Sequence, residues 1–341
     1  MRTRKTNWTL VLKIMAIVIL ALLAALIIFF FAGWPSKTKN VEYGMTLSRP
    51  YAYELKVDYD QILKYALDEM DIRRFRLPAY WSDLEPKQGE WQFANLDKDV
   101  NEINKRGGKV ILAVGKKLPR WPECWMPDWY YKLSKPDQDV AALDYIKTVV
   151  ERYKRSDAIL AWQVENEPHF GYGFCPKMDN AFIKKETDFV RSLDSSHPIY
   201  TTDSGELSTW FTLGKYVDKL GVSVYRVVRN PALGNRNFKY FFLPPWFYER
   251  KALLARLFGV KGVYVSEFQM EPWSNKSLNE TPIEDQLTSM DLKQMQENFA
   301  YAERMGIDNI DFWGLEWWTW MKDHGHPELL QAATEFYRAH Q

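Results

Sequence analysis

The sequence is poor in cysteine and has no dominant charge. It has two cysteines in 341 residues, Cys124 and Cys175, which is too few for a cysteine-based metal cluster or a framework of several disulfides. The 45 basic and 44 acidic residues leave a net charge of +1, so no broad electrostatic attraction points to nucleic acid. The 5 histidines, among them His324 and His326, show no metal-ligand spacing. We therefore expect no metal, no cofactor and no nucleic-acid partner.

The sequence also lacks the motifs of two common enzyme classes. Gly44-Met45-Thr46-Leu47 stands where a nucleotide-binding fold would carry a Gly-rich loop, and no Ser-His-Asp order appears. Aromatic residues, by contrast, make up 16% of the chain, with 15 tryptophans. Aromatic rings have flat apolar faces and a polar edge, which suit the C–H faces of sugars as well as core packing. We expect part of this surplus to line a cleft.

The N-terminal segment is a long hydrophobic run. From Ile14 to Phe31 no side chain is charged or strongly polar, and a run of this length can span the hydrocarbon of a bilayer. A cleaved signal peptide has a shorter apolar region and a small-x-small cleavage site, whereas bulky residues here lead directly into Ala32-Gly33-Trp34-Pro35. We expect residues 1–7 in the cytoplasm, 8–33 as a transmembrane signal anchor, 34–40 as a linker and 41–341 as one extracytoplasmic domain. The basic residues before the run favour this orientation, and Lys37 and Lys39 weaken the bias.

Beyond residue 40, strand-like apolar runs alternate with amphipathic helical patterns. The strand candidates are residues 41–47, 72–77, 109–114, 159–164, 199–202, 221–225, 262–266 and 309–313. The helix candidates are residues 58–70, 96–106, 140–153, 181–193, 209–219, 246–258, 284–305 and 327–340, with Gly107, Gly259 and Gly306 where C-caps belong. Eight βα units with short connections predict an α/β fold, a closed (β/α)8 TIM barrel, with an open doubly wound sheet as the alternative.

Two of these strand-like segments lead into a glutamate. They are Trp162-Gln163-Val164-Glu165-Asn166-Glu167-Pro168 and Val263-Tyr264-Val265-Ser266-Glu267-Phe268. Catalytic groups of parallel barrels lie at the C-terminal ends of the strands, so Glu167 and Glu267 are expected to face one pocket. Such a pair can hydrolyse a glycosidic bond with retention when one carboxylate attacks the anomeric carbon and the other carboxyl, about 5–5.5 Å away, protonates the leaving group. The surroundings of the two carboxyls must then give them different pKa values, so that the nucleophile is ionised and the acid keeps its proton.

The same residues carry a resemblance to a known group of enzymes. Asn166-Glu167-Pro168 and Ser266-Glu267 resemble the acid/base and nucleophile signatures of clan A glycoside hydrolases, which include the cellulase-like, β-glucosidase and β-galactosidase families. Further segments resemble the second, sixth and eighth strands of that clan in the correct order: Phe75-Arg76-Leu77-Pro78-Ala79-Tyr80-Trp81-Ser82 followed by Leu84-Glu85-Pro86 and Gly89-Glu90-Trp91, then Val222-Ser223-Val224-Tyr225, then Phe312-Trp313-Gly314.

The resemblance implies a role for each matching residue. It implies that Glu167 is the general acid/base, that Glu267 is the nucleophile, and that Asn166 holds the 2-hydroxyl of the sugar at the cleavage point. Arg76 would keep Glu267 ionised, and Tyr225 would donate a hydrogen bond to the same carboxylate. The floor under that sugar would be one of three tryptophans in a Trp-rich stretch: Trp313, Trp317 or Trp318.

Several neighbouring residues have structural interpretations. Glu165 shares a strand face with Glu167, and we expect it to form an ion pair with an arginine inside the barrel, for which Arg76 is one candidate. Glu271 is a competing nucleophile. Trp81 is expected to contact substrate. Trp121, in the Pro-containing loop after the third strand, either binds sugar or belongs to a lid over the barrel.

The two cysteines fall in loops after successive predicted strands. Neighbouring loops of one rim can approach within disulfide distance, so Cys124 and Cys175 form either a bridge or two separate buried thiols. Taken together, the sequence predicts a membrane-anchored retaining glycosidase, exposed at the cell surface or in the periplasm, that cleaves a β-linked glycoside or polysaccharide. A transglycosylase on the same site and a carbohydrate-binding protein without turnover are the alternatives.

Overall fold

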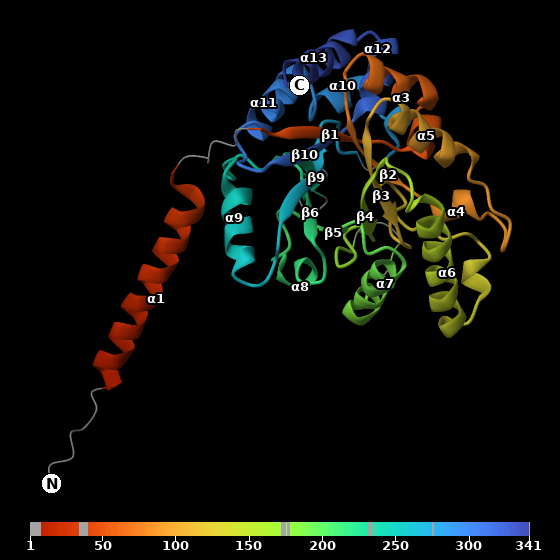
Figure 1. Cartoon of the computed structure of the whole chain (residues 1–341). Coiled ribbons are helices and arrows are strands. Elements are labelled where there is room, and N and C mark those ends of the chain that lie inside the picture. Colours follow the sequence, from red (N-terminus) through yellow and green to blue (C-terminus); the bar gives the residue numbers. More distant parts are fainter. Residues whose placement is uncertain are drawn as a thin grey trace.

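The computed structural model describes residues 8–33, 40–171, 175, 178–230, 234, 236–274 and 276–340. The expected cytoplasmic segment 1–7 and all but the last residue of the expected linker 34–40 lie outside these residues. Helix α1 (Trp8–Phe31) projects from the rest of the chain as a separate rod beside α9 (Figure 1), and none of its residues is buried. Its 24 residues correspond to about 36 Å at 1.5 Å per residue. By length and composition α1 can cross a membrane.

Eight parallel strands close into a barrel in the order β1, β10, β9, β6, β5, β4, β3 and β2 (Figure 1). Their bounds are β1 Glu42–Thr46, β2 Arg74–Pro78, β3 Lys109–Val114, β4 Ile159–Val164, β5 Ile199–Asp203, β6 Lys219–Val224, β9 Val263–Gln269 and β10 Asn309–Trp313. An antiparallel hairpin of β7 (Val227–Asn230) and β8 (Arg236–Lys239) follows β6 outside the barrel. The predicted (β/α)8 barrel is therefore confirmed.

The helices surround the barrel and bury its outer face. They are α2 Arg49–Glu54, α3 Tyr59–Asp68, α4 Trp81–Leu84, α5 Ala94–Lys105, α6 Lys135–Tyr153, α7 Asn180–Leu193, α8 Phe211–Gly214, α9 Phe247–Arg256, α10 Ile283–Leu287, α11 Leu292–Ala302, α12 Leu315–Asp323 and α13 Pro327–Ala339, with 3₁₀ turns at Tyr130–Lys132 and Leu278–Glu280. Because helices cover one face and the interior fills the other, strand residues are buried on both sides, as in all five positions of β2.

Two expected helices differ from the structure. The helix expected at 284–305 is divided into α10 and α11, because the Asp291 side chain caps a new helix by accepting a hydrogen bond from the Gln294 N–H. The helix expected at 209–219 is only α8, because Lys219 already pairs with Tyr200 of β5 as the first residue of β6.

Strand β9 contains an irregularity that the sequence pattern does not reveal. Val265 lies opposite Val222 of β6, but Glu267 lies opposite Ser223, so Ser266 is an additional residue in β9. Such a bulge bends a strand and redirects its side chains. The strand expected to end at Ser266 continues to Gln269, and Glu267 therefore lies within β9 rather than after it.

Candidate active site

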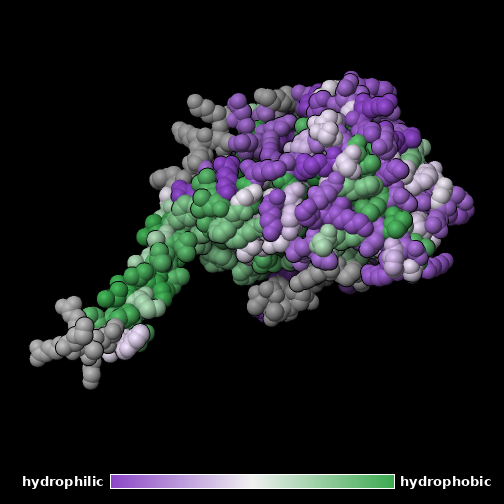
Figure 2. Space-filling view, turned by 60° about the horizontal axis from the view of Figure 1, so that its bottom comes forward, coloured by the Kyte–Doolittle hydropathy of each residue, from purple (hydrophilic) through white to green (hydrophobic). Residues whose placement is uncertain are grey.

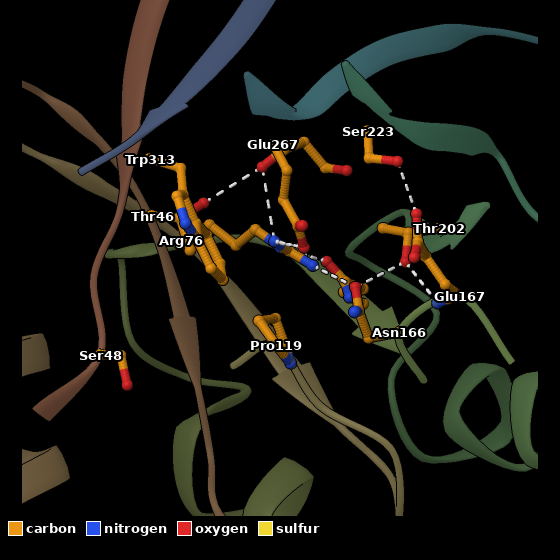
Figure 3. Close-up of polar contacts among 12 residues, drawn as sticks. Thr46, Ser48, Arg76, Pro119, Asn166, Glu167, Thr202, Ser223, Glu267 and Trp313 are labelled. Carbon is orange, nitrogen blue, oxygen red and sulfur yellow. Dashed lines mark hydrogen bonds and ion pairs between the residues drawn. The ribbon is translucent and has the colours of Figure 1, made fainter. Parts of the chain in front are cut away.

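Glu167 and Glu267 lie at the same C-terminal rim of the barrel. Glu167 follows β4, and Glu267 is presented by the bulge in β9. Ser223 of β6 connects them, because its backbone lies opposite Glu267 and its hydroxyl donates to Glu167 Oε1 over 2.6 Å (Figure 3). Two carboxyls separated by a hundred residues in sequence are thus brought to one cluster.

Arg76 on β2 joins three of the surrounding groups. Its guanidinium donates from Nη1 to Glu267 Oε1 (2.8 Å), from Nη2 to Asn166 Oδ1 (2.7 Å) and from Nε to Gln163 Oε1 (2.6 Å) (Figure 3). The arginine is completely buried. A buried guanidinium with a fixed set of acceptors holds its partners rigidly, and its charge favours the ionised form of a neighbouring carboxylate.

The second oxygen of Glu267 has a donor of its own. The Tyr225 hydroxyl, just beyond β6, donates to Glu267 Oε2 over 3.2 Å. Glu267 therefore has a guanidinium at one oxygen and a phenolic donor at the other. The two contacts expected from the resemblance, those of Arg76 and Tyr225, are present in the structure.

Glu167 is in the opposite electrostatic situation. Burial raises the pKa of its carboxyl well above the usual range, and the negative charges of Glu267 and Glu123 raise it further. The hydrogen bond from Ser223 works against this shift but is a smaller contribution. The surroundings of Glu167 thus favour its neutral acid form.

The backbone that carries Glu167 is held in an uncommon conformation. Glu165 and Glu167 have positive φ angles of 61° and 43°, a region that non-glycine residues occupy mainly where the surroundings impose it. The Glu167 N–H donates to Thr202 Oγ1 (2.8 Å), and the Thr202 hydroxyl donates to Asn166 Oδ1 (2.8 Å). Because Asn166 Oδ1 accepts from both Arg76 and Thr202, its Nδ2 group is left to donate elsewhere.

Glu165 does not form the expected ion pair with an arginine. Its two carboxylate oxygens accept the backbone N–H groups of Lys116 (2.8 Å) and Lys117 (2.7 Å). The turn after β3 supplies these donors, so an arginine is not needed to satisfy the buried carboxylate. Glu165 thereby ties the β3 and β4 ends of the barrel together.

The structure adds Lys117 and Glu123, which sequence reasoning missed. Lys117 is completely buried, and its ammonium donates to the backbone carbonyls of Glu167 (3.0 Å) and Phe170 (2.7 Å). It also lies 2.9 Å from Glu123 Oε2. Burial raises the pKa of Glu123 to about 7, although Lys117 favours its charged form. Neither residue belongs to a strand or helix pattern, so no periodicity marked them.

The loop that carries Glu123 is linked to the segment after Glu167. Cys124 and Cys175 are joined by a disulfide with an S–S length of 2.04 Å. This is the first of the two pairing states that the sequence left open.

Three of the expected sugar-binding tryptophans are part of the core instead. Trp81, Trp317 and Trp318 are fully buried, and each indole N–H is bonded inside the protein, to Glu85 Oε2, Gln286 Oε1 and the Met270 carbonyl respectively. Rings buried in this way expose no face to a ligand, so the structure does not support a substrate contact for any of the three. Trp121, at 55% exposure, is on the surface, where either of its two interpretations still applies.

Trp313, the last residue of β10, is the member of the Trp-rich stretch that lies beside the site (Figure 3). Its indole donates to Glu271 Oε1 over 2.7 Å, and the Arg120 guanidinium lies 3.7 Å from its ring centre. Arg120 also binds both oxygens of Glu271. Glu271, the competing nucleophile, is therefore held in an ion pair of its own.

No group of three or more His, Cys, Asp or Glu side chains that could hold a metal ion occurs among the described residues. The site consists of two carboxyls, a buried arginine, an amide, a tyrosine and a tryptophan at the end of a parallel barrel. This set can bind a polyhydroxylated ligand, transfer a proton and provide a nucleophile.

Comparison with known proteins places the chain in a recognisable group. The sequence model of cellulase (glycosyl hydrolase family 5) matches residues 39–231, more than half of the chain. A probable mannan endo-1,4-β-mannosidase A of Aspergillus clavatus is 29% identical over 220 residues, 55% of this chain and 59% of that protein. A β-galactosidase of Lactobacillus acidophilus is 26% identical over 160 residues, 36% of this chain and 22% of that protein. The chain thus spans less than two thirds of the length of these curated relatives.

Solved structures show the same fold at lower identity. A GH5_18 protein of Bifidobacterium longum superposes with a TM-score of 0.57 at 14% identity, covering 81% of this chain and 70% of that one. Native xylanase 10B of Thermotoga maritima gives a TM-score of 0.56 at 17% identity, covering 80% and 83% of the two chains.

Proposed function

The chain belongs to glycosyl hydrolase family 5, and from this premise we propose that it hydrolyses a β-linked glycoside or polysaccharide with retention of configuration. Glu267 is the nucleophile and Glu167 the general acid/base. The observation that carries the proposal is the contrast between them: Arg76 and Tyr225 donate to Glu267, while burial and negative neighbours raise the pKa of Glu167. The family match ends at residue 231, so the role of Glu267 rests on this geometry and on the Ser266-Glu267 motif.

The first step forms a covalent ester. Glu267 attacks the anomeric carbon while the Glu167 carboxyl gives its proton to the departing glycosidic oxygen. Formation of the ester removes the negative charge of Glu267, which is one of the causes of the raised pKa of Glu167. Glu167 was left ionised when it gave its proton to the leaving group. It now accepts a proton from the incoming water, which attacks the anomeric carbon from the face opposite Glu267 and breaks the ester bond.

The neighbouring residues position the sugar. Asn166 uses its Nδ2 group to donate to the 2-hydroxyl, since its Oδ1 is already occupied by Arg76 and Thr202. A hydrogen bond at this hydroxyl strengthens as the transition state forms. Trp313 provides the aromatic surface beside the anomeric centre, and Lys117 fixes the backbone of Glu167 through its carbonyl.

The location of the domain is part of the proposal. Helix α1 is retained as a membrane anchor, and the domain lies on the extracytoplasmic side. The Cys124–Cys175 disulfide supports this location, because disulfides persist mainly in oxidising compartments.

Product stereochemistry tests the mechanism directly. A panel of chromogenic β-glycosides and β-linked polysaccharides identifies a substrate, and proton NMR then follows the first product formed. The β-anomer should appear first, and prompt formation of the α-anomer would rule out double displacement.

Variants of the two carboxyls assign their roles. Glu267→Ala and Glu167→Ala should each lose several orders of magnitude in turnover. Added azide should give an α-glycosyl azide with Glu267→Ala, because azide then replaces the nucleophile. It should give a β-glycosyl azide with Glu167→Ala, because azide then attacks the covalent ester. Reversed anomers would exchange the two roles, and near-normal turnover of Glu267→Ala would move the nucleophile to Glu271.

A further inference from the structure

The end of α1 is packed against α9. Phe30 and Phe31 both contact Phe247 at the start of α9, with ring centres 5.4 and 6.1 Å apart. Arg250, one turn further along α9, donates to the Phe29 carbonyl over 3.5 Å and lies 5.2 Å from the Phe29 ring centre. Helix α9 therefore begins at the level where α1 ends.

The outer surface of α9 and the turn after it carries large apolar side chains that the protein does not cover. Leu253, Leu257 and Phe258 are 43%, 80% and 55% exposed. The Phe258 ring is stacked on Phe211 of α8, with centres 4.2 Å apart. We call Leu253, Leu257, Phe258 and Phe211 the α9 patch. A soluble surface rarely exposes several neighbouring residues of this size without a partner.

The patch lies partly on the helix that contacts the end of α1, and exposed basic residues are close to it in the sequence. Figure 2 shows the hydrophobic side chains of α1 passing onto the adjoining face of the domain. Arg256, which precedes Leu257, and Lys215, four residues after Phe211, are exposed. Leucine and phenylalanine flanked by arginine and lysine are typical of helices that lie in the membrane interface, because apolar side chains enter the acyl region and basic ones meet the headgroups.

We propose that the α9 patch is a second membrane contact and that the domain rests on the bilayer surface through it. This proposal depends on the proposed retention of α1 as an anchor. The contact of Phe30 and Phe31 with Phe247 brings α9 to the end of the span, so the bilayer is the partner already adjacent to the patch. The patch would restrain the domain in one orientation on the membrane, instead of leaving it to swing on its linker.

Site-specific fluorescence in lipid vesicles tests the contact. The full chain is reconstituted in vesicles of neutral and anionic lipid, with an environment-sensitive dye on a single introduced cysteine and the native disulfide intact. Leu257→Cys reports the patch. Val140→Cys is the matched control, because Val140 is an exposed apolar residue (58%) on α6, on the opposite flank of the barrel (Figure 1). Leu20→Cys in α1 reports the anchor. Lipids with a nitroxide in the upper part of the acyl chain serve as quenchers for position 257, and lipids with a nitroxide near the end of the chain serve as quenchers for position 20.

The proposal predicts strong quenching and a blue-shifted emission at position 257, and neither at position 140. Strong quenching at position 20 with none at 257 would overturn the α9 contact and leave the anchor intact. Absence of quenching at both positions would overturn the anchor and the α9 contact together. A blue shift at 257 that no lipid quencher affects, but that disappears at high lipid-to-protein ratio, would assign the patch to a second copy of the chain. In every case hydrolysis by Leu257→Cys should equal that of the unmodified chain, because the patch lies outside the active site.

Discussion

Strand β2 carries two fully buried arginines two positions apart, and they serve the two ends of the barrel differently. Arg74 donates to Asp311 Oδ1 from Nε (2.9 Å) and Nη2 (2.6 Å) and to Glu42 Oε2 from Nη1 (3.0 Å). Arg76 donates to Glu267, Asn166 and Gln163. Both side chains point into the barrel because a strand repeats every two residues.

The difference lies in what surrounds each ion pair. Asp311 is wholly buried, and Gly44 of β1 passes so close that a Cβ there would stand 2.1 Å from Asp311 Oδ1. The ion pair is therefore closely packed against the backbone of β1. Arg76 instead donates to Glu267 at the rim of the barrel. Glu167, whose pKa is raised, lies at the same rim. In such barrels the N-terminal end provides stability and the C-terminal end provides chemistry.

Replacing Arg74 should cost the most stability. Arg74→Met leaves the Asp311 carboxylate buried without its partner, and we expect a loss of about 3–5 kcal/mol in the free energy of unfolding. Denaturant unfolding measures the loss, and kcat of the folded protein should stay within about threefold of the unmodified value. The double variant Arg74→Met with Asp311→Leu should recover much of the stability, because it removes both charges. A large fall in kcat for Arg74→Met would remove the distinction between the two arginines.

Replacing Arg76 should affect turnover most. Arg76→Met removes the charge and the donor beside Glu267, and we expect kcat to fall by about 10²–10³-fold, the usual effect of losing one preorganised donor in an active site. Steady-state kinetics at a pH where the protein is folded measures this loss. If Arg76→Met were to lower stability alone and leave kcat near normal, Arg76 would be structural like Arg74.

Closing the space at Gly44 should have an intermediate effect. Gly44→Ala places a methyl group against Asp311 and Arg74, and overpacking of this kind costs about 1–3 kcal/mol. A lower midpoint of thermal unfolding with kcat unchanged is the expected outcome. Unchanged stability would mean that the barrel around Asp311 has room to adjust.

Removing the charge of Glu123 should give the smallest effect on activity, seen in the pH profile. In the proposed role of general acid, Glu167 acts only when protonated, so activity should fall as the pH rises through its pKa. Glu123 raises that pKa when it is ionised, and Glu123→Gln should therefore move the alkaline limb of kcat/KM to lower pH by about one unit or less. The acid limb should stay in place. A shift of the alkaline limb to higher pH would contradict the assigned coupling.

The strands were predictable because burial on both faces leaves near-continuous apolar runs in the sequence. The runs at residues 109–114 and 159–164 have the same first and last residues as β3 and β4. The bulge at Ser266 was not predictable, since an extra residue changes pairing without changing composition. It places Glu267 inside a strand that the sequence pattern ended one residue earlier.

The tryptophans show the same limit at the site. Trp313 ends a strand, and Trp317 and Trp318 follow on a helix that begins at Leu315. A run of similar residues does not show where the strand ends and the following helix begins. Lys117 and Glu123 were missed for a related reason, because their positions depend on the path of one loop and not on a repeating pattern.

The central claim is that Glu267 becomes covalently bonded to the sugar during turnover. A 2-deoxy-2-fluoro-β-glycoside with an activated leaving group, of the sugar identified by the substrate panel, should inactivate the enzyme with one equivalent of bound sugar. Peptide mass mapping of the trapped protein should find that sugar on the peptide containing Glu267. An adduct on Glu271, or turnover of the same compound with prompt release of the α-anomer, would contradict the account.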